Sequence, residues 1–239
     1  MTTLDYSAFD ALTFDCYGTL IDWETGILAA LRPMLAAHGV TPPEDELLEA
    51  FGRTEATAEA GPYRPYREIL ASCLREICSE YGIGPSHEAT SVFGGSVADW
   101  PAFPDSAAAL QRLRTRFRLG VITNCDTDLF AASNARLGVE FDWVVTAQSV
   151  GSYKPDPRNF EAAFAAIARA GIPRQRILHI AQSLFHDHVP AKRFGLSTVW
   201  IDRRHGRAGA GATPPASATP DAAFPDMTSF AAAATREPQ

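Results

Sequence analysis

The sequence predicts an α/β protein built on a parallel sheet, with a second domain made only of helices. Two observations predict the sheet: apolar, β-branched runs recur along the chain, and segments with helical spacing lie between them. The apolar runs are continuous rather than alternating, which is typical of strands covered on both faces. A third observation predicts the helical domain, because residues 24–95 hold helical patterns with no strand pattern between them.

The expected strands are short runs, each followed by polar or turn residues. They are residues 12–15, 118–124, 143–147, 176–183 and 197–203. The expected helices between them are residues 105–117, 127–138, 156–171 and 186–195. Three of these helices end at or next to Gly, a residue that commonly ends a helix. Strands and helices therefore alternate, as they do in a parallel sheet with helices on its faces.

The helical stretch after the first strand predicts an inserted domain over the carboxyl edge of the sheet. We expect a core domain of residues 1–22 and 100–239 and a helical cap domain of residues 23–99. The stretch WPAFPDS (100–106) is the expected return hinge. Residues 206–225, rich in Gly, Pro, Ala, Ser and Thr, predict a surface loop without chemistry, followed by a short strand or turn and a closing helix.

Composition excludes several classes of function. The chain has 239 residues, 46% of them hydrophobic, enough for one or two domains with a sizeable core. Its 28 acidic residues outnumber 21 basic ones, for a formal net charge of −7, so a nucleic-acid partner is not expected. No apolar run approaches about 18 residues and no signal-peptide pattern opens the chain, so we expect a cytoplasmic protein without a membrane partner.

Polar side chains follow the expected strands at the points where those strands end. They are Asp15, then Thr123 and Asn124, then Lys154, then Asp187. Each alone has an ordinary explanation as a helix cap, a turn or a solvated loop residue. Ligands of open α/β sheets bind at the carboxyl ends of the strands, and these residues would meet there. Together they predict a catalytic site.

The order FDCYGTL, ITN, YKPD and HD resembles the haloacid dehalogenase superfamily over nearly the whole chain. The resemblance implies a Rossmann-like parallel sheet core with an inserted helical cap. It also implies that Asp15 is a nucleophile and that Thr123 and Asn124 occupy the second motif. Lys154 would keep Asp15 ionised, since a nearby cation lowers the pKa of a carboxyl group. Asp187 matches the fourth-motif acid and is the expected base.

Tyr17 indicates the branch of this superfamily. Most members are phosphatases with Asp-x-Asp in the first motif, and the second Asp protonates a poor leaving group. Here Tyr17 takes that position, and a phenol with a reference pKa of about 10 is not a matched acid near neutral pH. A halide leaves as an anion and needs no acid. The Asp-x-Tyr-Gly-Thr-Leu pattern therefore resembles the type II, L-2-haloacid dehalogenase branch. Thr19 would cradle the Asp15 carboxylate, and Tyr17 would line the substrate site.

No metal ion and no other cofactor is expected. Phosphatases of this kind use Mg²⁺, which prefers several oxygen ligands, and their fourth motif usually offers paired acids. Here HIAQSLFHDH offers only Asp187, and the flanking His186 and His188 lie two residues apart, which do not share one face of a helix. The four cysteines lack metal-ligand spacing and predict reduced thiols. Mg²⁺ belongs only to the phosphatase alternative.

The chain also departs from the dehalogenase pattern. Gln182, Ser183 and Leu184 stand where the pattern reads roughly Ser-Ser-Asn, and Phe160 stands where it has Tyr. We expect Gln182 and Ser183 to line the substrate site. The loss of an amide and a phenol predicts a drier pocket with fewer hydrogen-bond donors, and so detectable but poor hydrolysis of 2-chloropropionate or chloroacetate.

The cap arginine of the pattern, which helps to bind halide or carboxylate, has no clear counterpart. The aligned stretch reads PEDELLEAF, and Arg53 follows it, with Arg64 and Arg67 in GPYRPYRE. The ordinary explanation of any one of them is a solvated helix face. Taking these three residues as candidates, we predict that binding of a substrate carboxylate depends on at least one cap arginine.

The leading hypothesis is a hydrolase that displaces halide from a short 2-haloacid through an Asp15 ester and gives the 2-hydroxy acid. Three alternatives stay open. The same site would open another electrophilic carbon, such as a strained heterocycle that carries a carboxylate. It would act as a Mg²⁺-dependent phosphatase if Asp15 and Asp187 shared a metal ion. A catalytically silent scaffold is the third. The expected partner is a small carboxylate substrate, and the oligomeric state, a homodimer included, is left open.

Overall fold

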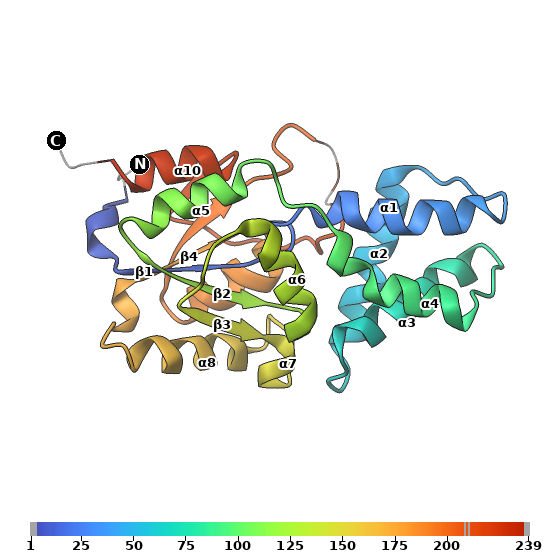
Figure 1. The fold of residues 1–239 in the computed structure, drawn as a ribbon, viewed down its shortest axis with the longest axis horizontal. Helices are drawn as coiled ribbons and strands as arrows, with labels where there is room; N and C mark the ends of the chain where they lie inside the picture. The colour runs from blue at the N-terminus through green and yellow to red at the C-terminus, as the bar shows by residue number, and fades with distance from the viewer. Residues whose placement is uncertain (1–3, 208, 210, 237–239) are drawn as a thin grey trace.

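Parallel strands form one sheet in the computed structural model, which describes residues 4–207, 209 and 211–236 (Figure 1). Their order across the sheet is β3-β2-β1-β4-β5-β6, so the first strand lies in the middle. The strands are β1 (Ala11–Phe14), β2 (Arg118–Thr123), β3 (Trp143–Thr146), β4 (Ile177–Ala181), β5 (Ser197–Ile201) and β6 (Ala222–Phe224). Neighbouring strands pair in parallel throughout. This topology confirms the predicted α/β class.

Helices cover both faces of the sheet, which is why the strand sequences are apolar throughout. Figure 1 shows α5 (Ser106–Arg114) and α10 (Met227–Ala234) on one side and α8 (Pro157–Ala168) on the other. Leu12 of β1 belongs to the same buried cluster as the apolar residues of α5 and α10. Its neighbour Ala11 belongs to the cluster formed with α8. Successive side chains of a strand point to opposite faces, so each face of β1 needs an apolar residue.

Four helices and a 3-10 helix occupy the chain between β1 and α5, and the described residues there form no strand. They are α1 (Trp23–Ala36), α2 (Glu44–Glu59), α3 (Tyr66–Glu80), α4 (His87–Gly95) and η2 (Ser96–Asp99). They lie together at one end of the sheet (Figure 1). The chain segments that lead into and out of this insertion pair through an antiparallel bridge between Ile21 and Ala102. The helical content of the insertion agrees with the sequence, and the exact domain bounds remain a prediction.

The remaining elements include the predicted helix α6 and several short helices that the sequence patterns did not resolve. They are η1 (Tyr6–Ala8), α6 (Thr127–Leu137), α7 (Ala147–Val150), η3 (Arg174–Arg176), η4 (Leu184–His188) and α9 (Val189–Arg193). The expected helix at 186–195 begins as a π-helix, because the Ser183 carbonyl accepts the N–H of His188 five residues on. None of the helices described is long and apolar enough to cross a membrane. The four cysteines are buried and free.

The loop at 206–225 contains more structure than its composition indicates. β6 ends it, and residues 208 and 210 lie outside the described residues. The Ala212 carbonyl lies against Gly52 of α2, where a Cβ would stand 2.3 Å from its oxygen. Glycine is therefore needed at that point of the helix for the loop to approach. The Ala212 N–H donates to Glu24 of α1 at 3.0 Å. The expectation of a surface loop is wrong for part of this segment, because Ala212 and Thr213 are buried and Thr213 lines the candidate site.

One buried carboxylate ties the core to the helical cap. Asp126 follows β2, and its side chain is fully buried. It accepts hydrogen bonds from the N–H groups of Tyr66 at 2.8 Å and Arg67 at 3.2 Å. These are the first two residues of α3, which has no side-chain cap of its own. A helix N-terminus leaves such N–H groups unpaired, and a carboxylate there also favours the helix dipole.

Replacing Asp126 with Ala is therefore expected to lower the free energy of unfolding by about 1–3 kcal/mol, since one buried and one partly buried N–H donor lose their acceptor. Asp128→Ala is the matched control. Asp128 also pairs with Arg67, at 2.9 Å, but its side chain is 66% exposed, so its loss should cost less than about 1 kcal/mol. Urea unfolding of both variants measures the difference. Equal losses in the two variants would show that Asp126 does not cap α3.

Candidate active site

The carboxyl edge of the sheet brings the predicted polar residues together. Asp15 directly follows β1, Asn124 directly follows β2, and Asp187 lies in the π-helix after β4. β1 pairs with both β2 and β4, so the three chain segments emerge side by side. Lys154 comes from the loop between α7 and α8. The parallel order thus places residues far apart in sequence at one point.

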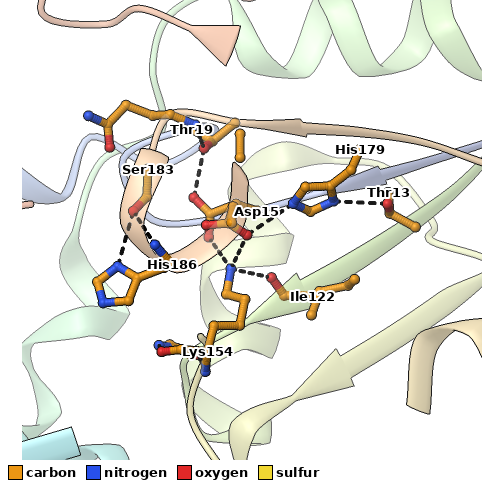
Figure 2. A network of polar contacts seen from close by, with 12 residues as sticks. Thr13, Asp15, Thr19, Ile122, Lys154, His179, Ser183 and His186 are labelled. Atoms are coloured by element: carbon orange, nitrogen blue, oxygen red, sulfur yellow. Dashed lines mark hydrogen bonds and ion pairs between the residues drawn. The ribbon is translucent and has the colours of Figure 1, made fainter. Parts of the chain in front are cut away.

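Lys154 joins the two acids (Figure 2). Its Nζ donates to Asp15 Oδ1 at 2.8 Å, to Asp187 Oδ1 at 2.7 Å and to the carbonyl of Ile122 at 2.8 Å. An ammonium has three N–H bonds, so all of its donors are used. The side chains of Lys154 and Asp187 are 1% and 0% exposed, and that of Asp15 is 8% exposed. We call Asp15, Lys154 and Asp187 the charged trio.

Thr19 holds the other oxygen of the nucleophile candidate. Its hydroxyl donates to Asp15 Oδ2 at 2.7 Å and accepts the N–H of Gln182 at 2.9 Å. Gly18 immediately before it adopts φ +89°, a conformation that L side chains rarely adopt, so the turn after Asp15 requires glycine. Both carboxylate oxygens of Asp15 therefore have fixed partners.

A histidine that the sequence analysis missed supports Asp187. His179 of β4 is fully buried, with Nε2 at 3.0 Å from Asp187 Oδ1 and Nδ1 at 2.9 Å from the Thr13 hydroxyl (Figure 2). Thr13 lies on the neighbouring strand, β1. If the ring donates to Asp187, it accepts from Thr13, and both nitrogens are satisfied. A His inside an otherwise apolar strand pattern was the available signal.

The charges of the trio follow from this geometry. Burial disfavours a charged Asp187, but Lys154 and the hydrogen bond from His179 outweigh it and hold the pKa of Asp187 well below its usual range. Burial opposes the charge of Lys154 too, yet the two carboxylates raise the pKa of that ammonium far above its usual value. For Asp15, burial raises the pKa above the ordinary value, while Lys154 and Thr19 act in the opposite direction.

A small cavity of about 30 Å³ lies against the trio. Besides the trio, its lining includes Tyr17, Trp23, Glu55, Glu59, Tyr66, Asn124, Ser183, His186 and Thr213. Core and cap both contribute, since α1, α2 and α3 supply four of these side chains. The space suits a group a few atoms in size. A larger cavity of about 580 Å³ shares Trp23 with it but contains no member of the trio.

The cap faces the trio with carboxyl groups. Glu55 is 3% exposed and accepts a 2.6 Å hydrogen bond from the Tyr66 hydroxyl. Glu59, with a side chain 5% exposed, accepts from Asn124 Nδ2 at 3.1 Å and lies 3.8 Å from His186 Nε2. Burial raises the pKa of Glu55 to about 8 and that of Glu59 well above its usual range. The sequence analysis missed both, although Glu55 continues the buried stripe of α2 four residues after Phe51.

Other predicted residues lie as follows. Asn124 accepts the N–H of Lys154 at 2.7 Å and so positions that loop. Ser183 lines the cavity and bonds with the ring of His186 at 3.1 Å (Figure 2). Gln182 contributes its backbone N–H to Thr19, and its side-chain oxygen accepts from Thr213 at 3.1 Å. Thr123 is buried outside the lining of the small cavity, and its hydroxyl has no partner among the described residues.

Tyr17 points away from the charged trio. Its hydroxyl lies 3.0 Å from Ser133 Oγ on α6, and its ring packs edge-on against Trp100 at 5.6 Å between centroids. Burial raises the pKa of Tyr17 well above its ordinary value, so the phenol stays neutral. It forms part of the cavity wall, and its oxygen already has a partner.

The three cap arginines lie outside the cavity. Arg53 pairs with Glu80 at 2.7 Å and Arg67 with Asp128 at 2.9 Å, with side chains 60% and 43% exposed. Arg64 donates to Ser72 at 3.1 Å. The expectation that one of them binds a substrate carboxylate has no support in this arrangement. Arg53 and Arg67 leave on other faces of α2 and α3 because the buried faces carry Glu55 and Tyr66, and Arg64 lies in the loop between these helices.

Phe160 and Leu184, the two residues expected to make the pocket drier, do not line the small cavity. Phe160 is fully buried on α8, and its ring lies 5.1 Å from that of His179, beneath the trio rather than in the cavity. Leu184 does not line the cavity either. The loss of an amide and a phenol at these two positions therefore does not make the pocket drier. Its lining instead carries more carboxyl groups than expected.

Comparisons with known proteins agree with this architecture. A family model described as haloacid dehalogenase-like hydrolase matches residues 9–184. An (S)-2-haloacid dehalogenase from Pseudomonas fluorescens is 25% identical over 197 residues, covering 81% of this chain and 84% of the relative. Pyrimidine 5'-nucleotidase YjjG from Escherichia coli is 29% identical over 213 residues, covering 84% and 76%. A solved L-2-haloacid dehalogenase from Xanthobacter autotrophicus, with chloropropionic acid covalently bound, has a TM-score of 0.76 at 17% identity, covering 94% and 97%.

Proposed function

Because the chain belongs to the haloacid dehalogenase-like hydrolase family, we propose that it hydrolyses the carbon–halogen bond of a short 2-haloacid or close analogue. The observation that carries this proposal is the charged trio beside a tyrosine in place of a second acid. Lys154 bridges Asp15 and Asp187, while Tyr17 is bonded to Ser133 and offers no carboxylate. This site has a nucleophile, and the motif position that supplies the acid for a poor leaving group in phosphatases holds a tyrosine.

The first step forms an ester. A carboxylate oxygen of Asp15 attacks the carbon, a carbon–oxygen bond forms, and the halide departs with the bonding electrons. Lys154 and Thr19 hold the carboxylate at 2.8 Å and 2.7 Å, so its orientation is set before the substrate arrives. A carboxylate whose pKa burial raises is also a stronger nucleophile than a solvated one.

The second step restores Asp15. Water adds to the carboxyl carbon of the ester, one of its protons ends on the product hydroxyl, and the other is released. Asp187 Oδ2 is buried and has no hydrogen-bond partner among the described residues, so it is the atom best placed to orient this water. Its lowered pKa makes Asp187 a weak base, and its role is then to position the water more than to accept the proton.

The donor set fits Mg²⁺ poorly. Both oxygens of Asp15 are engaged by Lys154 and Thr19, which leaves Asp187 Oδ2 as the oxygen of the trio without a hydrogen-bond partner in the described part of the chain. Mg²⁺ prefers an octahedral set of oxygen ligands. Within the described ranges, no three His, Cys, Asp or Glu side chains form a group that could hold a metal ion. The phosphatase alternative rests instead on the similarity to a nucleotidase.

Chelation is expected to leave hydrolysis unchanged, because no step of the proposed reaction uses a metal ion. The measurement is halide release from 2-chloropropionate and 2-bromopropionate with EDTA, and phosphate release from nucleoside monophosphates with and without Mg²⁺. Loss of all activity in EDTA, with recovery on adding Mg²⁺ and release of phosphate but not halide, would replace this proposal with the phosphatase alternative.

A further inference from the structure

The cap places two carboxyl groups at the cavity that the proposed reaction does not use. Glu55 and Glu59 lie one helical turn apart on α2, so both side chains face the core. Glu59 Oε2 accepts from Asn124, but Glu59 Oε1 is buried with no hydrogen-bond partner in the part of the chain that the structure describes. A buried polar atom without a partner costs free energy, and a ligand in the cavity would satisfy it.

The cavity offers an anion no free cation. Among the described residues of its lining, Lys154 is the only lysine or arginine, and all three of its N–H bonds already have acceptors. Burial lowers the pKa of His186 to about 4, so that ring is neutral near pH 7. The same lining contains four carboxyl groups, those of Asp15, Asp187, Glu55 and Glu59. A substrate carboxylate would lose its hydration without gaining a counter-ion, which is costly in a buried site.

We propose that Glu55 and Glu59 form a subsite for a protonated nitrogen group of the substrate, an ammonium or amidinium, beside the carbon that Asp15 attacks. The position of that carbon rests on the proposed function, whereas binding of the nitrogen group does not. A planar amidinium donates two parallel hydrogen bonds to a carboxylate, in the geometry of an arginine–carboxylate pair. The cationic group replaces the carboxylate of an ordinary 2-haloacid.

The subsite predicts a dependence on pH with a defined sign. With the cavity empty, the pKa of Glu55, raised by burial to about 8, keeps that carboxyl group protonated near pH 7. Burial raises the pKa of Glu59 as well, and a bound cation favours the ionised forms of both carboxyl groups. Affinity for a cation should therefore rise between pH 7 and pH 9. The titratable groups that face the pair or share its cavity are Asp15, Tyr17, Tyr66, Cys73, Tyr153, Lys154, His186 and Asp187. The phenols, the thiol and the ammonium titrate above this range, His186 and Asp187 titrate below it, and Asp15→Asn removes the remaining group.

Binding of unreactive isosteres tests the subsite without any turnover. Acetamidine, acetamide and acetate share one shape and differ in charge, and calorimetric titration at pH 8.5 compares them. We expect acetamidine to bind at least tenfold more tightly than acetate. Glu59→Gln should weaken acetamidine at least tenfold and leave acetate unchanged or tighter. Glu49→Gln is the matched control, an exposed acid on the same helix, and should change nothing.

If acetate binds as tightly as acetamidine, the proposed subsite is wrong. It is also wrong if the parent and Glu59→Gln bind acetamidine with equal affinity. Chloride release from chloroacetamidine, chloroacetamide and chloroacetate then separates the two proposals. If acetamidine binds through Glu59 and none of the chlorides is released, the subsite stands and the proposed hydrolysis is wrong. If chloroacetate alone reacts, and reacts equally in Glu59→Gln, the hydrolysis stands and the subsite is wrong.

Discussion

Replacing Asp15 with Asn is expected to lower kcat by at least about four orders of magnitude, because an amide oxygen cannot form the ester. The fold should survive. The charged trio has a formal charge of −1, and the substitution leaves a neutral pair of Lys154 and Asp187. The Asn oxygen still accepts from Thr19, but its NH2 group faces Lys154, so one N–H of the buried ammonium loses its acceptor. Halide release measures the activity, and thermal unfolding checks that the variant still unfolds in one cooperative transition.

The route of the oxygen atom tests the same residue in the parent protein. Turnover in ¹⁸O-labelled water should introduce label into the Asp15 carboxylate after several cycles, and mass spectrometry of the peptide that contains it detects the label. In a single turnover the product oxygen comes from Asp15 and is therefore unlabelled. Label that passes to the product in the first turnover while Asp15 remains unlabelled would contradict the ester mechanism.

Replacing Lys154 with Met is expected to damage both activity and stability. The two carboxylates would then face each other without the cation between them, and removing one partner of a buried ion pair typically costs about 3–5 kcal/mol. Loss of the ammonium also frees Asp15 from its orientation, so we expect kcat to fall by at least about a thousandfold. Urea unfolding and halide release measure the two effects.

The pH dependence of that variant separates a charge effect from a packing defect. In the parent, the pKa of Asp187 is lowered, so its contribution to stability is present above the unfolded pKa of about 4 and is lost as pH falls below it. In Lys154→Met, burial and the like charge raise the carboxyl pKa values, so the folded variant takes up protons and gains stability as pH falls. The stability gap should therefore close between pH 7 and pH 4. A constant gap over that range would indicate lost packing.

Much of the fold could be predicted from the sequence because its determinants are local. Continuous apolar runs identify β1, β2, β3, β4 and β5, and Gly after a helical pattern marks where a helix ends. β6 was harder to find, because its three residues lie at the end of a loop rich in small residues. It adds to the sheet at the edge by pairing with β5, a contact that the local sequence does not specify.

The residues of the trio could also be named in advance, because each follows a strand or a recognisable motif. Their contacts could not. His179 supports Asp187 only because β1 and β4 are neighbours, which brings Thr13 and His179 to one level of the sheet. Tyr17 keeps its place in the motif, but its hydroxyl is bonded to Ser133, 116 residues away. Such partners depend on the order of strands and on helix packing.

The sequence by itself determined the α/β class, the helical insertion and the placement of an acid, Asp15, at the end of a buried strand. Only the tertiary structure decided which side chains the cap presents to that acid. α2 carries Arg53 as well as Glu55 and Glu59, and its rotation about its own axis selects between them. That rotation is set by contacts with other elements, the close approach of Ala212 to Gly52 and the Tyr66 hydroxyl on Glu55. Because those contacts depend on how separate elements pack, the cap faces the site with carboxyl groups where arginines were expected.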